Sequence, residues 1–274
     1  MFFVFLALAT SARCRPSCLP KLASGEAIGT FAMVEGSGRA SADKISASVS
    51  GGMLTGTKLP VADGCDADFA VVAAKDEAGG LSLYLVSLTG EGVTRDVLET
   101  VDPTRGQAKL TFSGAPAELL GVAGEGWEIA SQVLDRAAIL MAFEQVGGAD
   151  KSLEMARDYA LERMAFGRQI GSFQAIQHHC ANMATDVEGS RYITYQAAWY
   201  LSEGMPAENE VAMAKAWVSE AYRRVCALGH QCHGAIGFTK EHNMQLYSRR
   251  AKAAELAFGD SDFHLEAVAE AIGL

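Results

Sequence analysis

The hydrophobic pattern of this 274-residue chain changes once, and that change constrains the fold more than any other feature. Before the glycine-rich segment 121–126, apolar residues alternate with polar ones or form short β-rich runs. After that segment they recur at spacings of three and four. Alternation is typical of a half-buried strand, whereas the longer spacing is typical of an amphipathic helix. We therefore predict an α+β chain in which an antiparallel β sandwich or barrel is followed by a helical bundle.

The strand signals are short runs bounded by turn residues. Ile45, Ala47 and Val49 alternate with polar residues and should lie on one face of a strand. FAVVAAK (69–75) and LSLYLVSL (81–88) are rich in β-branched and apolar residues, and Gly, Asp or Lys residues flank them. Short strands at this spacing indicate a sandwich or a barrel.

The second part should contain four or five helices. No proline interrupts the stretch from Trp127 to Arg163, which we predict to be the first and longest helix. Ser172 is expected to cap the second helix, because its hydroxyl can accept a hydrogen bond from a free N–H group of the first turn. The third helix should begin near Pro206 and end near Gly229, and another follows it.

Residues 1–18 form an apolar leader that we expect to lie outside the fold. The run MFFVFLALATSA resembles the core of a signal peptide, but it lacks a basic segment and is too short to cross a bilayer as a helix. We favour a leader from a misplaced translation start, because the later sequence is typical of a cytoplasmic protein. The predicted domains are therefore residues 19–122 and 123–274.

Charge and cysteine usage exclude several classes of function. The net charge of -10 disfavours nucleic acid or an anionic membrane surface as the main partner. Phosphate-bearing cofactors remain possible, because local Arg side chains and backbone N–H groups can bind them. The six cysteines form no CxxC pair and fit neither a zinc site nor a dense disulfide framework. We therefore expect free thiols and no metal site.

Four separated segments carry a resemblance to the acyl-CoA dehydrogenase family. ALERMAFGRQIGSFQAIQH (160–178) resembles the signature ER-x-x-FG-x-x-I-x-x-FQAIQH, and the segment 231–252 resembles the run Q-x-HGG-x-GFT-x-EH. The segments 19–35 and 119–135 resemble the entrance to the middle β domain and its junction with the final bundle. The resemblance covers residues 19–274 and implies a short form without the amino-terminal helical domain.

The resemblance implies an FAD-dependent oxidoreductase that dehydrogenates an acyl-CoA thioester between its α and β carbons. In the family a carboxylate base removes the α proton while the β hydrogen leaves as hydride to the flavin. Family members assemble as dimers or dimers of dimers, with FAD at the interface between subunits. The implied partners are an acyl-CoA substrate and a second chain of the same family.

One group of family positions is kept in this sequence. In the family the Arg and Phe of ER-x-x-FG, the Gln of FQ and the Gln that opens Q-x-HGG reach the FAD of the neighbouring subunit. Here these residues are Arg163, Phe166, Gln174 and Gln231. Gly234 keeps the first glycine of the HGG run. The resemblance implies that these five residues bind the cofactor across a subunit interface.

A second group, which holds the flavin ring of the same subunit in the family, has been replaced. The T-E-P tripeptide reads Val34-Glu35-Gly36, so a threonine hydroxyl is lost. In KLPVADG, Pro60 stands where the family has an indole that packs on the ring, and Ala62 stands where a hydroxyl bonds near N5. Pro60 removes much of an aromatic face.

The catalytic base of the family has also been replaced. Its usual position, in a YEG tripeptide, holds Phe258, and the alternative position on the first bundle helix holds Ala137. Ala138 replaces an Arg that helps bind substrate, whereas Asp135, which contacts the CoA moiety in the family, is kept. Glu144 lies about two turns after Ala137 and is a weak candidate for a displaced base, although a shift of about 10 Å exceeds catalytic tolerance.

Three interpretations follow from this pattern. The first is a subunit that gives cross-subunit flavin contacts to a catalytic partner in a hetero-oligomer. The second is a self-sufficient homo-oligomeric dehydrogenase with a displaced base. The third is a non-enzymatic assembly or binding protein on the same fold. We favour the first, because residues serving a neighbour's flavin persist while those serving the chain's own flavin are lost.

Overall fold

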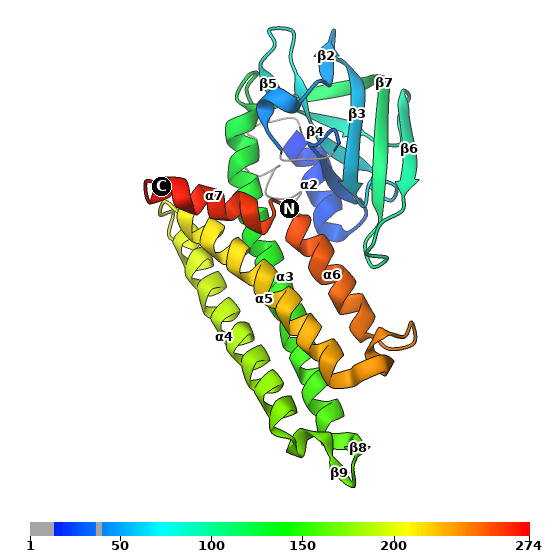
Figure 1. Cartoon of the computed structure of the whole chain (residues 1–274). Helices are drawn as coiled ribbons and strands as arrows, with labels where there is room; N and C mark the ends of the chain where they lie inside the picture. Colours follow the sequence, from blue (N-terminus) through cyan, green and yellow to red (C-terminus); the bar gives the residue numbers. More distant parts are fainter. Residues whose placement is uncertain (1–13, 37–39) are drawn as a thin grey trace. The chain divides into compact units, whose positions relative to one another are not determined.

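The computed structural model describes residues 14–36 and 40–274, which form two compact units divided between Leu134 and Asp135. The elements of the first unit are α2 (Cys14–Ser24), β1 (Gly29–Ala32), η1 (Ala42–Lys44), β2 (Ser48–Ser50), β3 (Met53–Ala62), β4 (Phe69–Lys75), β5 (Leu81–Ser87), β6 (Val93–Leu98), β7 (Gln107–Leu120) and the start of α3 (Gly126–Glu162). The rest of α3 belongs to the second unit. After α2, the strands of the first unit precede the long helices of the second, which confirms the predicted α+β class (Figure 1).

The seven strands form one sheet that closes into a barrel. The neighbours run β4, β2, β3, β7 and β5, and β5 pairs again with β4, so the path returns to its start. The prediction of an antiparallel sandwich or barrel is confirmed, because most strand pairs are antiparallel, but two pairs differ. β4 pairs in parallel with β1 and, at one position, with β2. Parallel neighbours arise here because long connections, and not hairpins, join these strands.

β4 is buried on both of its faces, which explains why its sequence is apolar without alternation. Ala70, Val72 and Ala74 point into a core inside the barrel. Val71 and Ala73 belong to a second core formed with α2 and the start of α3. Ile45, Ala47 and Val49 were predicted to lie on one face of a strand. All three are buried, but only Val49 lies in β2, and Ile45 packs in the second core while Ala47 and Val49 pack inside the barrel.

The predicted leader, residues 1–18, falls mostly outside the described residues. Helix α2 begins at Cys14, and Cys18 lies in the core with 5% of its surface exposed. The packed part of the chain therefore begins at or before Cys18, whereas the predicted first domain begins at residue 19. Whether the apolar run before it belongs to the fold stays a prediction.

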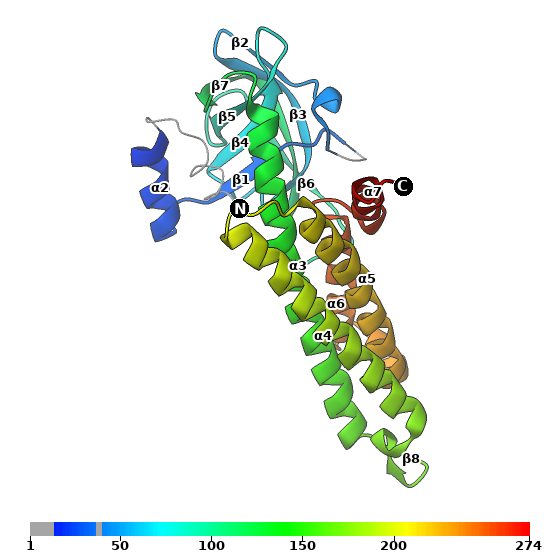
Figure 2. The ribbon, with the colours of Figure 1, turned by 90° about the vertical axis from the view of Figure 1, so that its left-hand side faces the viewer.

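The second unit is a bundle of helices around which short elements are arranged. Its elements after α3 are β8 (Met164–Ala165), β9 (Arg168–Gln169), η2 (Ile170–Ser172), α4 (Gln174–Ser202), α5 (Glu208–His233), η3 (Gly234–Phe238), α6 (Met244–Leu256) and α7 (Ser261–Ala271). In Figure 2 the second half of α3 runs beside α4 and α5, and the β8–β9 hairpin lies at one end of the bundle. Every helix among the described residues is too short or too polar to cross a membrane.

Two predicted helix ends were wrong for identifiable reasons. Ser172 does not cap α4, because its hydroxyl donates a hydrogen bond back to the carbonyl of Gln169 at 2.7 Å and Phe173 takes the cap position. α5 does not end near Gly229 but continues to His233. Gly229 is a packing glycine, because a Cβ atom there would lie 2.7 Å from Cε of Met244.

Candidate functional site

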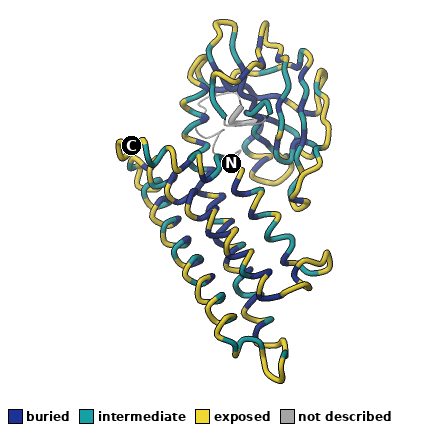
Figure 3. The backbone as a smooth tube through the Cα atoms, in the orientation of Figure 1, coloured by how far each residue is buried: buried dark blue, intermediate teal, exposed yellow. Residues whose placement is uncertain are grey.

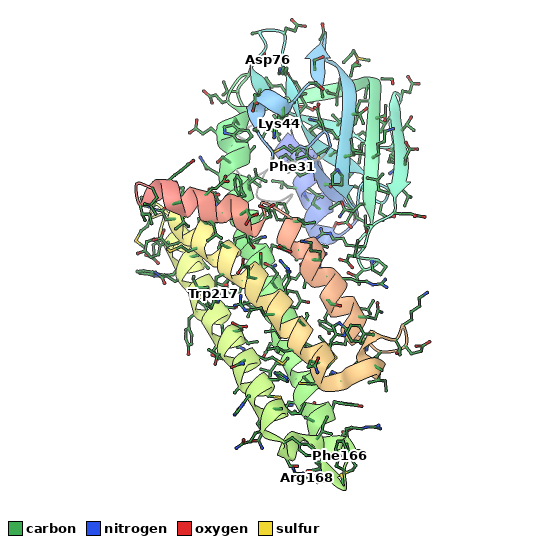
Figure 4. The ribbon with its side chains drawn as sticks, in the orientation of Figure 1. Phe31, Lys44, Asp76, Phe166, Arg168 and Trp217 are labelled. Atoms are coloured by element: carbon green, nitrogen blue, oxygen red, sulfur yellow. The ribbon has the colours of Figure 1, made fainter. Side chains whose placement is uncertain are left out.

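The hairpin of β8 and β9 places Phe166 at its tip. Phe166 and Gly167 form the two-residue loop, with φ angles of 53° and 79°. Positive φ at both positions is the geometry of a type I′ turn, which matches the twist of the two strands. Figure 4 shows Phe166 and Arg168 projecting at this end of the bundle, and Figure 3 shows the tip as exposed.

Phe166 is unfavourable at this position for folding alone. Its side chain is 95% exposed, and a left-handed conformation costs a residue with a Cβ about 1 kcal/mol or more. Asn or Asp would meet the same turn without either penalty. The guanidinium of Arg168 lies 4.0 Å from the centre of the Phe173 ring, and that ring meets Phe166 edge-on at 6.1 Å. The tip is thus ordered by its own side chains while its phenyl ring faces outward.

Arg163 and Gln174 flank the hairpin on its two sides. The carbonyl of Arg163 accepts a hydrogen bond from the N–H of Ile170 at 2.9 Å, and Gln174 is the first residue of α4. Gly171 lets the chain return over the end of α3, because a Cβ there would lie 2.9 Å from the carbonyl oxygen of Ala160. The side chains of Arg163 and Gln174 are both exposed.

Gln231 lies near the end of α5, at the same end of the bundle as the hairpin (Figures 1 and 2). The adjoining Gly234 terminates the helix with a φ of 63°. A stack of the Tyr159 and His233 rings, with centroids 4.7 Å apart, connects the end of α3 with the end of α5. The structure thus places four residues at the same end of the bundle, and we call them the bundle-end set: Arg163, Phe166, Gln174 and Gln231.

The polar members of the bundle-end set have free donors. Among the residues that the structure describes, the guanidinium of Arg163 and the amides of Gln174 and Gln231 have no hydrogen-bond or ion-pair partner. A guanidinium binds phosphate with charge-assisted, often paired hydrogen bonds. Two amides and an outward phenyl ring add hydrogen bonding and apolar contact beside it. This end of the bundle therefore has the chemistry to bind an anionic group joined to a ring system.

The two segments of the replaced group also lie together, in the barrel. The N–H of Leu59 donates to the carbonyl of Val34 at 3.0 Å, and the N–H of Gly36 donates to the carbonyl of Leu59 at 2.9 Å. These bonds place Val34 beside the segment that contains Pro60 and Ala62. None of these three side chains can donate or accept a hydrogen bond.

A buried ion pair supports these two segments, and the sequence interpretation missed it. The fully buried ammonium of Lys58 donates to the carbonyl of Met33 at 2.9 Å and to Oε1 of Glu35 at 2.7 Å. Burial alone raises the pKa of Glu35, but hydrogen bonds from Lys58, Ser46 and the N–H of Ala47 outweigh it and hold that pKa at about 2. Both residues stand in the segments Val34-Glu35-Gly36 and KLPVADG, but they are 23 positions apart and no local pattern pairs them.

Neither base position of the second unit carries a proton acceptor. Phe258 packs against the core between the helices with a φ of 60°. Its carbonyl accepts a hydrogen bond from Nε2 of His264 at 3.0 Å. Ala137 and Ala138 are buried on α3. Neither a phenyl ring nor a methyl group can remove a proton from carbon.

Lys215 is a second buried charge that sequence reasoning did not single out. Its Nζ donates to three backbone carbonyls at the end of α6 and in the following turn, at 3.0 to 3.1 Å: those of Ala254, Glu255 and Gly259. Burial lowers the pKa of Lys215 to about 8. This lysine holds the turn that contains Phe258.

Glu144 and Asp135 have opposite environments. The carboxylate of Glu144 is 47% exposed and forms an ion pair with Arg250, so the burial that a displaced base would need is missing. Asp135 is half-buried, and burial, helped by the negative charge of Glu208, raises its pKa to about 6. Asp135 therefore titrates well above the ordinary range of an aspartate.

Comparison with known proteins decides the family. The model of the acyl-CoA dehydrogenase C-terminal domain matches residues 124–273, more than half of the chain. This chain belongs to the acyl-CoA dehydrogenase family. The members of that family are oxidoreductases and flavoproteins that depend on FAD.

Individual relatives agree with the family match. An acyl-CoA dehydrogenase of Bacillus subtilis (strain 168) is 32% identical, and the match covers 89% of this chain and 68% of that protein. An acryloyl-CoA reductase (NADH) of Anaerotignum propionicum is 30% identical, with 93% and 68% covered. The crystal structure of an acyl-CoA dehydrogenase from Geobacillus kaustophilus has a TM-score of 0.93 at 27% identity, covering 98% of this chain and 75% of that one.

The two groups of residues fit the family's cofactor differently. The free guanidinium and amides of the bundle-end set suit the pyrophosphate of FAD, and Phe166 suits an apolar contact. At the acyl-CoA dehydrogenase positions for the chain's own flavin ring, Val34, Pro60 and Ala62 offer no hydrogen bond and no aromatic face. Residues of this chain could therefore hold FAD at the end of the bundle, but not by the family's usual contacts in the barrel.

Proposed function

We propose that this chain is a subunit of an FAD-dependent acyl-CoA dehydrogenase and that it contributes the bundle-end set to the flavin of a second chain. FAD, when bound, supplies the hydride acceptor. Arg163 would hold the pyrophosphate, Gln174 and Gln231 would hydrogen-bond the same part of the cofactor, and Phe166 would cover it from water. The partner chain would provide the carboxylate base and the contacts to the flavin ring.

The observation that supports this proposal most strongly is the position of Phe166 at the hairpin tip. An almost fully exposed phenyl ring in a left-handed conformation destabilises the isolated chain, yet its surroundings hold it in place. Backbone strain of this kind persists where a binding function requires it. The adjacent free donors of Arg163, Gln174 and Gln231 point to the same use.

The state of the base positions supports a division of labour. Phe258 and Ala137 cannot accept a proton, and Glu144 is paired with Arg250 at the surface. The turn at Phe258 is nevertheless held by Lys215, and the barrel segments are held by an ion pair of their own. The fold is therefore intact where the catalytic side chains have been replaced. An assembly partner needs the fold and the bundle-end set but no base.

Co-purification from the native source tests this proposal. Tagged at its carboxyl end, the chain should bring down a second, longer chain of the family that carries a carboxylate at its own base position, together with FAD in a ratio of one per pair of chains. A chain that purifies only with itself would contradict the division of labour. A complex that contains a partner but no FAD would contradict the assigned role of the bundle-end set.

A further inference from the structure

One side-chain contact joins the two parts of the bundle-end set. The ring of Tyr159 on α3 stacks on the ring of His233 on α5, with centroids 4.7 Å apart and planes 27° apart. The carbonyl of Tyr159 accepts a hydrogen bond from the N–H of Arg163 at 2.9 Å. His233 lies two residues after Gln231. The stack therefore links the helix turn that carries Arg163 to the one that carries Gln231.

The orientation of the His233 ring is fixed independently of Tyr159. Its Nδ1 donates a hydrogen bond to the carbonyl of Gly229 at 2.7 Å, since a carbonyl can only accept. The ring of His242 lies against it with centroids 4.6 Å apart. Burial, with the nearby charge of His242, lowers the pKa of His233 and favours its neutral form. Tyr159 thus stacks on a ring that cannot rotate freely.

Close packing on the other side also holds this end of α5. The 3-10 turn η3 folds back against the helix, and a Cβ at Gly237 would lie 3.0 Å from Cβ of His233. The ring of His230 stacks on that of Phe238 with centroids 4.3 Å apart. The end of α5 is therefore packed on several sides, and Tyr159 adds an aromatic contact from α3 to it.

We propose that Tyr159 is the positioning residue of the bundle-end set, and that its stack on His233 holds Arg163 and Gln231 in one fixed frame. The inference rests on the proposed function, because it concerns the geometry with which these residues meet FAD. Tyr159 itself is not assigned a contact with the cofactor. Its hydroxyl is not required, because the contact is between ring faces.

Hydrogen–deuterium exchange of the isolated chain tests the link without a partner. Tyr159→Leu should speed amide exchange in the segments 163–170 and 229–234 by about 3- to 10-fold, because an aromatic pair adds about 0.5–1.5 kcal/mol beyond burial. Tyr159→Phe keeps the stack and should exchange like the wild type. Phe143→Leu is the matched control, because it removes an aromatic pair with Tyr195 elsewhere on α3. Unchanged exchange in Tyr159→Leu would overturn the inference.

Titration of FAD into the reconstituted complex tests the consequence for the site. Tyr159→Leu should raise the Kd for FAD by about 3- to 10-fold, while Tyr159→Phe and Phe143→Leu stay within about twofold of the wild type. A loss in Phe143→Leu as large as that in Tyr159→Leu would show general destabilisation and overturn the positioning role. Arg163→Ala separates the two claims. If it weakens FAD binding and Tyr159→Leu does not, this inference alone fails, and if it has no effect, the proposed function fails.

Discussion

Lys58 and Glu35 form a buried ion pair that joins the two barrel segments which, in the family, face the flavin of the same subunit. The pair keeps Val34 beside the strand with Pro60, although neither side chain can contact a flavin ring as the family's residues do. The ion pair therefore holds these two segments together although Val34 and Pro60 carry no hydrogen-bonding side chain. The same holds for Lys215 and the turn at Phe258.

Glu35→Gln should lower the free energy of unfolding by about 2 kcal/mol at pH 7, because it removes the charge that pairs with the buried Lys58. The pKa of Glu35 is about 2, below its ordinary 4.5, so its contribution is complete above about pH 4.5 and is lost as the pH falls toward 2. Urea unfolding followed by circular dichroism should therefore show a smaller difference from the wild type at pH 3.

The control for that measurement is Glu91→Gln, which removes an exposed carboxylate from the same unit and should change the free energy of unfolding by less than about 0.5 kcal/mol. An equal difference between wild type and Glu35→Gln at pH 7 and pH 3 would show that the ion pair does not act through its charge.

Asp135→Asn should have the opposite effect and stabilise the chain by about 1–2 kcal/mol at pH 8. Burial raises the pKa of Asp135 from 3.8 to about 6, so the folded state binds the proton more tightly than the unfolded state. The stability of the wild type therefore falls as the pH rises from about 4 through 6, and the amide variant lacks this fall. Urea unfolding of the wild type and Asp135→Asn at pH 4 and pH 8 measures this difference in the free energy of unfolding. A variant that is less stable than the wild type at pH 8 would refute the assignment.

Local sequence patterns predicted those elements whose ends depend on the chain itself. The span of α3 was predicted to within one residue at each end, because its apolar spacing is continuous and no proline interrupts it. The end of α5 could not be predicted in the same way. In sequence, Gly229 resembles the end of a helix. In the structure, Met244 from a later segment occupies the space that a side chain at Gly229 would need.

In the candidate site, too, local motifs could be predicted from the sequence, whereas contacts between separate helices could not. Arg163 and Gln231 were identified from motifs, and the structure places them at one end of the bundle. The Tyr159–His233 stack and the contacts of Lys215 were not foreseen, because each joins residues from separate helices and depends on tertiary packing. Buried charges of this kind have no local sequence signature.

Phe166→Asn should increase the folding stability of the isolated chain and decrease FAD binding in the complex. Asparagine tolerates positive φ, so the variant should raise the free energy of unfolding of the isolated chain by about 0.5–1 kcal/mol. The same change should weaken FAD binding in the complex, because the phenyl ring is lost. Phe166→Ala serves as the control: it also loses the ring but keeps the strain, so it should weaken FAD binding without stabilising the chain. Full FAD affinity in both variants would show that the exposed ring has no role in the cofactor site.

The isolated chain should not dehydrogenate acyl-CoA thioesters with an artificial electron acceptor, and it should bind FAD weakly. Both expectations follow from the absence of a proton acceptor at Phe258 and Ala137 and from the replacement of the ring contacts at Val34 and Pro60. The assay is a steady-state measurement on straight-chain and branched acyl-CoA substrates with added FAD. Turnover on any of them, with stoichiometric FAD, would favour a self-sufficient enzyme instead.

The affinity of the reconstituted complex for FAD, compared between the wild type and Arg163→Ala, tests the central claim most directly. Loss of a charged hydrogen-bond donor to the pyrophosphate should cost about 1.5–3 kcal/mol, which is a Kd about 10- to 150-fold higher. Arg157→Ala removes the same charge from α3 at a residue that pairs with Asp158, and it should leave the Kd unchanged. An Arg163→Ala complex that binds FAD as tightly as the wild type would contradict the assignment of the bundle-end set to a partner's flavin.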